Sequence, residues 1–267
     1  MPVLVTGVEG AVGRRAVHQL AAGGGEVRAF VQADLAAPAR SEALAGSYRQ
    51  LGCKVAHGHL DDEAHLETAL EQVHTVLHLL GRPTDDPAAH LDATATVVSA
   101  AIGAGCRRLV LLSDLAIAQV AQNPWLEALA EAEELAADAP LESVVLRCAV
   151  IVGPDDPLTA ALAAGALGDD PPGAHWPVSW IDVATTAVLA DAERDLDTSL
   201  HVEASLTGPA RVTTADLARR LAELVAHEPE APAGGALPAH AADLLTRTTE
   251  RPEGALISQG TPIDAGW

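Results

Sequence analysis

The chain has 267 residues, of which 49% are hydrophobic, and it carries a formal net charge of −21 at pH 7. This length is enough for one large α/β domain, or for one domain with a small additional lobe. The acidic balance argues against a nucleic-acid partner, because phosphate binding requires a basic surface.

Two further classes of protein are disfavoured by simple patterns. No apolar run reaches the ~20 residues that span a bilayer, and the N-terminus lacks a secretory signal pattern. We therefore expect a cytoplasmic protein without membrane contact. The three cysteines, Cys53, Cys106 and Cys148, lie far apart without metal-binding spacing, which indicates reduced thiols and no metal site.

The first fourteen residues combine a strand, a glycine-rich turn and a helix. The apolar run at residues 3–5 stops abruptly, which is typical of a short buried strand. Three glycines follow at the spacing G-x-x-G-x-x-G, and a helical pattern begins beside them. This order allows a tight turn, close approach of backbone N–H groups to a pyrophosphate, and close helix–strand packing. We predict that a dinucleotide binds here, at Thr6, Gly7, Gly10, Ala11, Val12 and Gly13.

Strands and helices alternate from this turn to residue 153. Further strands are predicted over residues 26–32, 53–58, 74–81, 107–114 and 141–153. Helices are predicted over residues 41–52, 61–73, 88–105 and 123–138, the last with Asn123 as its cap and Pro124 at its first position. This alternation predicts a doubly wound parallel sheet, a Rossmann fold, over residues 1–153.

The regular alternation loosens after Gly153. Residues 154–177 are rich in proline and small residues and are predicted to be irregular, followed by a helix at 180–193, a strand at 200–206 and a helix at 213–227. We expect residues 154–227 to form a small substrate lobe interleaved with the last core elements. Residues 228–267 form a Pro/Ala-rich C-terminal segment in which only 240–248 has a helical pattern.

Residues 3–227 resemble the extended and atypical short-chain dehydrogenases/reductases. The resemblance rests on TGVEGAVG, on residues 58–81 and 98–114, on LESVVLRCAVIVGP and on WIDVATTAVLA. It implies that Ser113 takes the position of the active-site serine. It also implies that Trp125 and Leu129 stand where this family carries a catalytic tyrosine and lysine. The chain has one tyrosine, Tyr48, and one lysine, Lys54, both elsewhere, and so it is most similar to the atypical, NmrA-like group.

The form of the cofactor depends on residues after strands two and three. The end of strand two carries Gln32, where a Rossmann fold usually has an acid for NAD or a nearby arginine for NADP. Arg14 or Arg15 could meet a 2′-phosphate, which favours NADP over NAD, or could lie on a solvated helix face. His59 stands where the family usually has an aspartate. The remaining predicted cofactor contacts are Leu60, Leu80 and Gly81.

Candidate catalytic residues lie at the carboxyl ends of the strands, where Rossmann folds bind their ligands. Ser113 could hydrogen-bond a substrate carbonyl, and the adjacent Asp114 is the best candidate for a substitute acid or base. Both could also be ordinary loop residues. The predicted substrate pocket comprises Arg82, Trp125, Cys148, Val150 and Trp176, with Trp180 as a further apolar wall.

Three functions fit these features. The first is an NAD(P)-dependent oxidoreductase acting on a small carbonyl or planar substrate without the tyrosine–lysine pair. The second is a non-redox cyclase or isomerase, and the third is a regulatory protein that senses the dinucleotide. In each case the expected partner is a small molecule.

Overall fold

The protein is built on a single large sheet of parallel strands. The computed structural model describes residues 1–119, 122–153, 156–192, 201–225 and 235–258. In these residues the large sheet has the strand order β12-β10-β6-β5-β4-β1-β2-β3, and every pairing within it is parallel. Its strands are β1 (Val3–Thr6), β2 (Val27–Gln32), β3 (Lys54–Gly58), β4 (Thr75–His78), β5 (Arg108–Asp114), β6 (Glu142–Cys148), β10 (His201–Thr207) and β12 (Leu256–Ile257). The predicted doubly wound sheet is confirmed.

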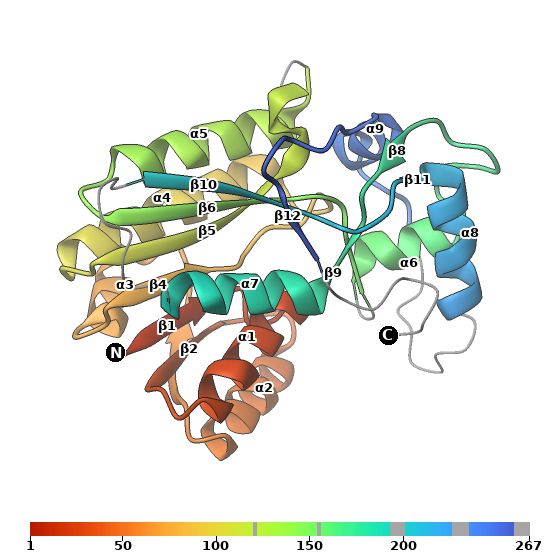
Figure 1. Ribbon diagram of the computed structural model, residues 1–267. Coiled ribbons are helices and arrows are strands. Elements are labelled where there is room, and N and C mark those ends of the chain that lie inside the picture. Colours follow the sequence, from red (N-terminus) through yellow and green to blue (C-terminus); the bar gives the residue numbers. More distant parts are fainter. Residues whose placement is uncertain (120–121, 154–155, 193–200, 226–234, 259–267) are drawn as a thin grey trace.

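Helices cover both faces of this sheet (Figure 1). One layer comprises α1 (Ala11–Ala22), α2 (Pro38–Gln50) and α7 (Trp180–Ala192); the other comprises α3 (Glu63–Leu70), α4 (Pro87–Gly103) and α5 (Pro124–Asp138). Successive side chains of a strand point to opposite faces. Val3 and Val5 accordingly pack against the first layer, whereas Leu4 packs against the second. Strands buried on both faces therefore read as continuous apolar runs in the sequence.

The strand order reverses direction between β1 and β4. From β1 the chain proceeds outward through β2 to β3, and then returns to β4 on the other side of β1. In open parallel sheets such a switch point opens a crevice at the carboxyl ends of the strands. The glycine turn lies at this end, because it follows β1 and precedes α1.

A smaller lobe adjoins the same end of the sheet (Figure 1). This C-terminal lobe comprises α6 (Pro157–Ala163), α8 (Thr214–Val225), α9 (Ala239–Thr246) and four short strands: β7 (Ile151–Val152) paired with β9 (Val178–Ser179), and β8 (Ala174–His175) paired with β11 (Val212–Thr213). Leucines from all three helices form its core, among them Leu158, Leu217 and Leu245.

The structure corrects several sequence predictions in this second part of the chain. The strand predicted over 141–153 ends at Cys148, and β7 pairs with β9 rather than continuing in the large sheet. The stretch predicted to be irregular contains α6 and β8. A short strand, β12, extends the edge of the sheet beyond β10, and a 3₁₀ helix, η1 (Leu115–Gln119), follows β5.

Smaller corrections concern the ends of two helices. Helix α2 begins at Pro38 rather than at residue 41, because proline is well suited to the first helical turn. Helix α3 ends at Leu70, earlier than predicted, and Gln72 beyond it has a positive φ of 63°.

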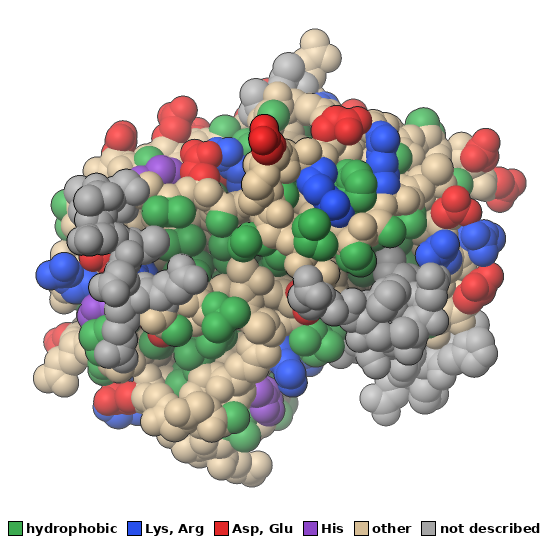
Figure 2. Space-filling view, in the orientation of Figure 1, with side chains coloured by type: hydrophobic (Ala, Val, Ile, Leu, Met, Phe, Trp, Pro, Cys, Tyr) green, Lys and Arg blue, Asp and Glu red, His purple; other side chains and the backbone are tan. Residues whose placement is uncertain are grey.

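The surface carries charged side chains of both signs. On the face shown in Figure 2, acidic side chains are scattered and interspersed with basic ones. In the described part of the chain, no helix has the length and apolar character needed to cross a membrane. Nor do the described residues contain a group of three or more His, Cys, Asp or Glu that could hold a metal ion.

Candidate functional site

A cleft opens at the carboxyl ends of the central strands. The glycine turn contributes one part of its lining through Gly7, Glu9, Gly10, Ala11 and Val12, together with Gln32 at the end of β2. The loop after β4 and the end of β5 contribute the middle, with Leu79, Leu80, Gly81, Arg82, Pro83, Leu112, Ser113 and Asp114. The far part is lined by Trp125, Leu129, Cys148, Ala149, Val150, Ile151, Gly153, Asp156, Leu158, Trp180 and Leu244. The cleft therefore joins the switch point of the sheet to the C-terminal lobe.

The three glycines of the turn have different structural roles. Gly7 has a φ of +72°, and a Cβ there would lie 2.3 Å from the Leu79 carbonyl oxygen. A Cβ on Gly13 would lie 2.3 Å from the Gly7 carbonyl oxygen. Gly10 meets only one atom, the Gly7 carbonyl oxygen at 3.4 Å, and it lines the cleft. Gly7 and Gly13 thus serve close backbone packing, whereas a side chain on Gly10 would project into the space for a ligand.

The first turn of α1 is suited to hold a phosphate group. Gly10 is its N-cap and has no side chain that could accept a hydrogen bond from the first N–H groups of the helix. No acidic residue occupies the first helical turn. The backbone N–H groups at this end, with the positive end of the helix dipole, are therefore available to an anion in the cleft. The residues present fit the pyrophosphate of a dinucleotide.

Glu9 is an acidic residue inside this turn. Its carboxylate Oε1 accepts a hydrogen bond of 2.6 Å from the backbone N–H of Gln32. Its second oxygen, Oε2, is buried and has no hydrogen-bond partner among the described residues. Burial raises the pKa of Glu9, partly opposed by the Gln32 hydrogen bond and the nearby charges of Arg82 and His57.

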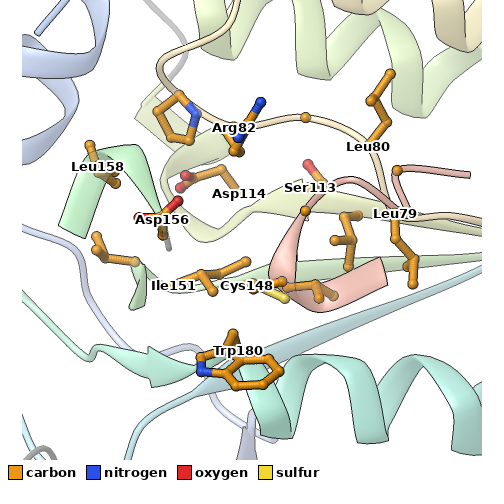
Figure 3. Close-up of a pocket in the computed structure, with 18 of the residues that line it drawn as sticks. Leu79, Leu80, Arg82, Ser113, Asp114, Cys148, Ile151, Asp156, Leu158 and Trp180 are labelled. Atoms are coloured by element: carbon orange, nitrogen blue, oxygen red, sulfur yellow. The ribbon is translucent and has the colours of Figure 1, made fainter. Parts of the chain in front are cut away.

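Two polar residues occupy the end of β5 in the middle of the cleft (Figure 3). Asp114 Oδ1 accepts a hydrogen bond of 2.8 Å from the Ala116 N–H, and burial raises the pKa of Asp114 to about 6. The Ser113 hydroxyl is buried and has no partner among the described residues. Cys148 is paired with Asp114 across β5 and β6. Burial raises the pKa of the Cys148 thiol, so the thiol stays protonated.

Trp125 and Leu129, on the first turns of α5, both line the cleft. Neither side chain can exchange a proton with a substrate. Tyr48 lies elsewhere, buried on α2 with its hydroxyl donating to the Val8 carbonyl at 2.7 Å. Lys54 is exposed on β3 and pairs with Glu26.

The lobe contributes one carboxylate and several apolar walls. Asp156 caps α6, with Oδ2 accepting from the Thr159 N–H at 2.7 Å and from its hydroxyl at 2.9 Å. Burial raises the pKa of Asp156. Figure 3 shows Asp156, Leu158 and Trp180 around the cleft together with Asp114. Trp180 lies so close to Gly153 that a Cβ there would be 2.0 Å from the Trp180 ring.

The structure brings most of the predicted site residues together. Those that line the cleft are Gly7, Gly10, Ala11, Val12, Gln32, Leu80, Gly81, Arg82, Ser113, Asp114, Trp125, Cys148 and Val150. Gly13 supports the turn from beneath. Thr6 is buried behind it, with its hydroxyl 2.8 Å from His78 Nδ1.

Besides Thr6 and Gly13, three predicted residues lie outside this lining. His59 is exposed and Leu60 is buried after β3. Trp176 is also not among the lining residues: its ring lies under the Arg251 guanidinium, 3.8 Å from centroid to Cζ, and Trp180 forms the aromatic wall instead. Trp176 lies in the short connection between β8 and β9, and its contact with Arg251 is on the side of the C-terminal part of the chain.

The sequence interpretation missed two charged residues of the cleft. Glu9 occupies a variable position of the glycine motif, so the motif gives it no role. Its hydrogen bond with the Gln32 N–H on β2 forms only in the folded protein. Asp156 did carry a signal, since it precedes Pro157 in the pattern of an N-cap followed by a first-turn proline.

Comparisons with known proteins agree with this arrangement. The profile of the NAD(P)H-binding family matches residues 7–194. No functionally curated protein matches the chain. Among solved structures, MoeE5 in complex with UDP-glucose and NAD is 23% identical, with a TM-score of 0.68 over 97% of this chain and 90% of its own.

Two further structures show the same fold. The UDP-glucose 4-epimerase of Thermus thermophilus in complex with NAD is 21% identical, with a TM-score of 0.67 over 94% of this chain and 91% of its own. The dTDP-glucose 4,6-dehydratase DesIV of Streptomyces venezuelae is 18% identical, with a TM-score of 0.68 over 90% and 86%. The family match covers more than half of the chain, and the cleft fits a nicotinamide dinucleotide. The chain therefore belongs to the NAD(P)H-binding family, and it has the Rossmann fold of these solved structures.

Proposed function

We propose that the protein is an oxidoreductase that interconverts a carbonyl and a hydroxyl group on a small or planar substrate, with Asp114 as the proton donor and acceptor. The observation that carries this proposal is the place of Asp114, at the carboxyl end of β5 in the middle of the cleft. Its pKa of about 6 lets the side chain hold or release a proton near neutral pH.

The protein's part in this reaction is to place the substrate and supply one proton. Bound NAD(P) supplies or accepts the hydride. The Ser113 hydroxyl, which has no partner among the described residues, is available to donate a hydrogen bond to the substrate oxygen. In reduction the protonated Asp114 gives its proton to that oxygen and becomes a carboxylate; in oxidation it takes the proton back.

The walls of the cleft favour a substrate with an apolar or planar body. Trp125, Val150, Leu158 and Trp180 surround the polar centre. Their large apolar side chains exclude water, which strengthens the electrostatic effect of the few polar groups.

The proposal extends to the positions of the tyrosine–lysine pair and to the roles of the three parts of the chain. Because Trp125 and Leu129 line the cleft, they can occupy the positions of the tyrosine–lysine pair without its chemistry, as in an atypical, NmrA-like member that works in the cytoplasm. Residues 1–153 would then hold the cofactor, residues 154–227 would contact the substrate, and residues 228–267 would complete the lobe. This division is supported by the cleft, whose lining comes from both the core and the lobe.

The form of the cofactor is also a proposal, and two sets of residues favour different answers. Arg14 and Arg15, on the first turn of α1, favour NADP if either reaches the 2′-phosphate. Glu9 and its buried, unpaired oxygen favour NAD. Replacing both arginines by glutamine tests the first alternative: binding to NADP would weaken while binding to NAD would not.

The central experiment compares the wild-type protein with Asp114→Asn. Each is mixed with NADH or NADPH and a panel of aldehydes and ketones, and the reduced-nicotinamide absorbance is followed against pH. A positioned acid contributes ~10²–10⁴-fold, and Asp114→Asn should lose about that much activity. Because the acid form donates the proton, wild-type kcat/KM for reduction should fall as the pH rises through about 6. The oxidation rate should rise over the same range.

A matched control is Asp156→Asn, a second buried carboxylate of the cleft that caps α6. It should keep the same pH profile. If dinucleotide binds but none of the carbonyl compounds consumes it, the oxidoreductase proposal is wrong and the sensor or the non-redox enzyme takes its place. If Asp114→Asn keeps full activity and the pH profile, Asp114 is not the acid.

A gain-of-function variant tests the assignment of the missing pair. Trp125→Tyr combined with Leu129→Lys restores a tyrosine and a lysine to the wall of the cleft. If these positions match those of the family, carbonyl reduction should become faster and less dependent on Asp114. A folded double variant with no gain would contradict the assignment.

A further inference from the structure

Glu9 connects two elements that meet at one end of the cleft. It lies in the turn between β1 and α1, and its carboxylate extends to the carboxyl end of β2. There Oε1 accepts the 2.6 Å hydrogen bond from the Gln32 N–H, which fixes the direction of the side chain. Both residues line the cleft, as do Gly10 and Ala11.

The carboxyl end of β2 is where a Rossmann fold meets the adenosine ribose of its cofactor. An acid at this place accepts a hydrogen bond from the ribose 2′-hydroxyl, whereas a nearby arginine accommodates the 2′-phosphate of NADP. In this chain β2 ends in Gln32, which is uncharged. The acid at this place comes instead from the glycine turn, through Glu9.

The second oxygen of Glu9 has an unmet capacity for hydrogen bonding. Oε2 is buried and has no partner among the described residues. A buried acceptor without a partner destabilises the folded protein, and a hydrogen bond from a ligand hydroxyl would recover that loss. A hydroxyl is a donor, as this oxygen requires, whereas a phosphate ester at neutral pH is mainly an acceptor.

The charge of Glu9 also favours a 2′-hydroxyl over a 2′-phosphate. A phosphate monoester carries about −1.5 to −2 charges at pH 7, and it would be desolvated beside a carboxylate. The positive charge of Arg82 lowers the pKa of Glu9. Arg82 is itself in an ion pair with Asp85, with Nη2 3.3 Å from Oδ1. His57 also acts on Glu9 but lies exposed on β3.

We propose that Glu9 selects NAD over NADP, by accepting a hydrogen bond from the adenosine ribose 2′-hydroxyl and by repelling a 2′-phosphate. This inference rests on the proposed dinucleotide binding and reverses the preference for NADP drawn from Arg14 and Arg15. The selecting acid is supplied by the phosphate-binding turn rather than by the strand that follows it.

Isothermal calorimetry with NAD⁺ and with NADP⁺ tests this inference on the full chain. Wild type should bind NAD⁺ more tightly by about tenfold or more, as a hydrogen bond to a charged group allows. Glu9→Gln keeps an oxygen for the Gln32 N–H and removes the charge. The ratio of the two affinities should therefore shift toward NADP⁺ by about tenfold, with a melting temperature no lower than that of wild type.

Asp34→Asn is the matched control, because Asp34 is the other acid just beyond β2. Its Oδ1 accepts hydrogen bonds of 2.9 Å from the N–H groups of Ala36 and Ala37, which asparagine can also accept. The affinity ratio should not change in this variant. The inference is wrong if wild type binds NADP⁺ at least as tightly as NAD⁺, or if Asp34→Asn and not Glu9→Gln shifts the ratio. If neither dinucleotide binds, the proposed function fails as well.

Discussion

The glycine turn and the interior of the C-terminal lobe show different kinds of contact. The turn belongs to the first four strands with their helices, here the nucleotide half. At the glycine turn, backbone atoms approach one another closely: a Cβ on Gly7 would lie 2.3 Å from the Leu79 carbonyl oxygen, and a Cβ on Gly13 would lie 2.3 Å from the Gly7 carbonyl oxygen. In the lobe, side chains bridge long sequence distances. His175 Nε2, for instance, lies 2.9 Å from the carbonyl oxygen of Leu245, seventy residues later.

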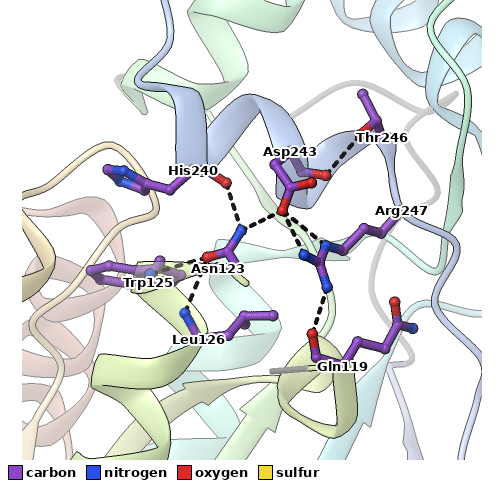
Figure 4. A network of polar contacts seen from close by, with 8 residues as sticks. All are labelled: Gln119, Asn123, Trp125, Leu126, His240, Asp243, Thr246 and Arg247. Carbon is purple, nitrogen blue, oxygen red and sulfur yellow. Dashed lines mark hydrogen bonds and ion pairs between the residues drawn. The ribbon is translucent and has the colours of Figure 1, made fainter. Parts of the chain in front are cut away.

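A polar network shows how the lobe is attached to the sheet (Figure 4). Asn123 Nδ2 donates to the His240 carbonyl at 3.0 Å and to Asp243 Oδ2 at 2.7 Å. Arg247 Nη2 donates to the same Asp243 oxygen at 2.7 Å, and Nη1 donates to the Gln119 carbonyl. Side chains and backbone carbonyls thus together join η1 and α5 to α9.

The difference shows what each part demands of the sequence. The glycine turn requires small residues at fixed spacing, and single substitutions there should act through steric overlap. The lobe requires particular donors and acceptors, and substitutions there should act through hydrogen bonds that are lost. The four predictions that follow test this contrast through the free energy of unfolding.

The largest effect is expected for Gly13→Ala. The added Cβ would lie 2.3 Å from the Gly7 carbonyl oxygen and 2.7 Å from its carbon, and backbone atoms cannot move aside independently. We expect a loss of about 3 kcal/mol or more in the free energy of unfolding, measured by urea denaturation.

Gly10→Val is the comparison for this variant. Its backbone angles, φ −82° and ψ 161°, suit any residue, and a Cβ meets only one atom at 3.4 Å. It should change the stability by less than about 1 kcal/mol, yet block the pyrophosphate and abolish binding of the dinucleotide. Equal stability losses in Gly13→Ala and Gly10→Val would remove the distinction between a packing glycine and a ligand glycine.

The same contrast explains how far the sequence predicts the structure. The sheet from β1 to β6 was predictable because buried parallel strands are apolar runs, and the glycine turn because its spacing is dictated by backbone contact. The break after Cys148 was not predictable, since residues 141–153 are largely apolar and only the pairing of β7 with β9 separates them.

The candidate site divides in the same way. Ser113 and Asp114 could be found because they end a strand, and Gly7 and Gly10 because they form a motif. Glu9 could not be assigned, because its partner is the backbone of Gln32, twenty-three residues away. Contacts of that kind depend on the assembled sheet and leave no local pattern.

The second prediction concerns Asn123, which is fully buried in the network of Figure 4. Asn123→Ala removes both the cap of α5, where Oδ1 accepts from the Trp125 and Leu126 N–H groups, and the link to Asp243. Together these contacts should be worth about 2 kcal/mol. Asn123→Ser keeps a cap and loses only the link, and should cost about half as much. If Asn123→Ser is as stable as wild type, the link to α9 contributes nothing.

The third prediction places a pH-sensitive contact where the two parts meet. The buried His90 ring lies between His78 and Trp125, with centroid distances of 6.4 and 4.9 Å, and Trp125 in turn stacks with His240 of α9. Burial lowers the pKa of His90 to about 4, so the folded protein holds it neutral. The unfolded chain binds a proton near pH ~6.5. Stability should therefore fall by about 1–2 kcal/mol between pH 7 and pH 5 on account of this residue.

His90→Leu removes the contribution of His90 to the pH dependence of stability. Neither ring nitrogen has a hydrogen-bond partner among the described residues, so a leucine of similar bulk loses no hydrogen bond there. The variant should unfold at a lower pH than wild type, whereas His18→Leu, on the exposed face of α1, should not. Identical acid-unfolding curves for wild type and His90→Leu would show that the ring is not held neutral.

The smallest effect on the free energy of unfolding is expected at Asp156. Here two variants separate the role of the side-chain oxygen as a hydrogen-bond acceptor from the role of its negative charge. Asp156→Ala removes the cap of α6 and both hydrogen bonds from Thr159, at a cost of about 1 kcal/mol. Asp156→Asn keeps the acceptor and removes a carboxylate whose pKa burial raises. A raised pKa means that the folded state holds the proton more tightly than the unfolded chain does, so ionisation costs stability as the pH rises above the usual aspartate value. Asp156→Asn should therefore be as stable as wild type or more stable at neutral pH, and calorimetric melting would show it. If asparagine proved as damaging as alanine, the charge itself would be holding α6 in place, and the lobe would depend on electrostatics rather than on the geometry of its hydrogen bonds.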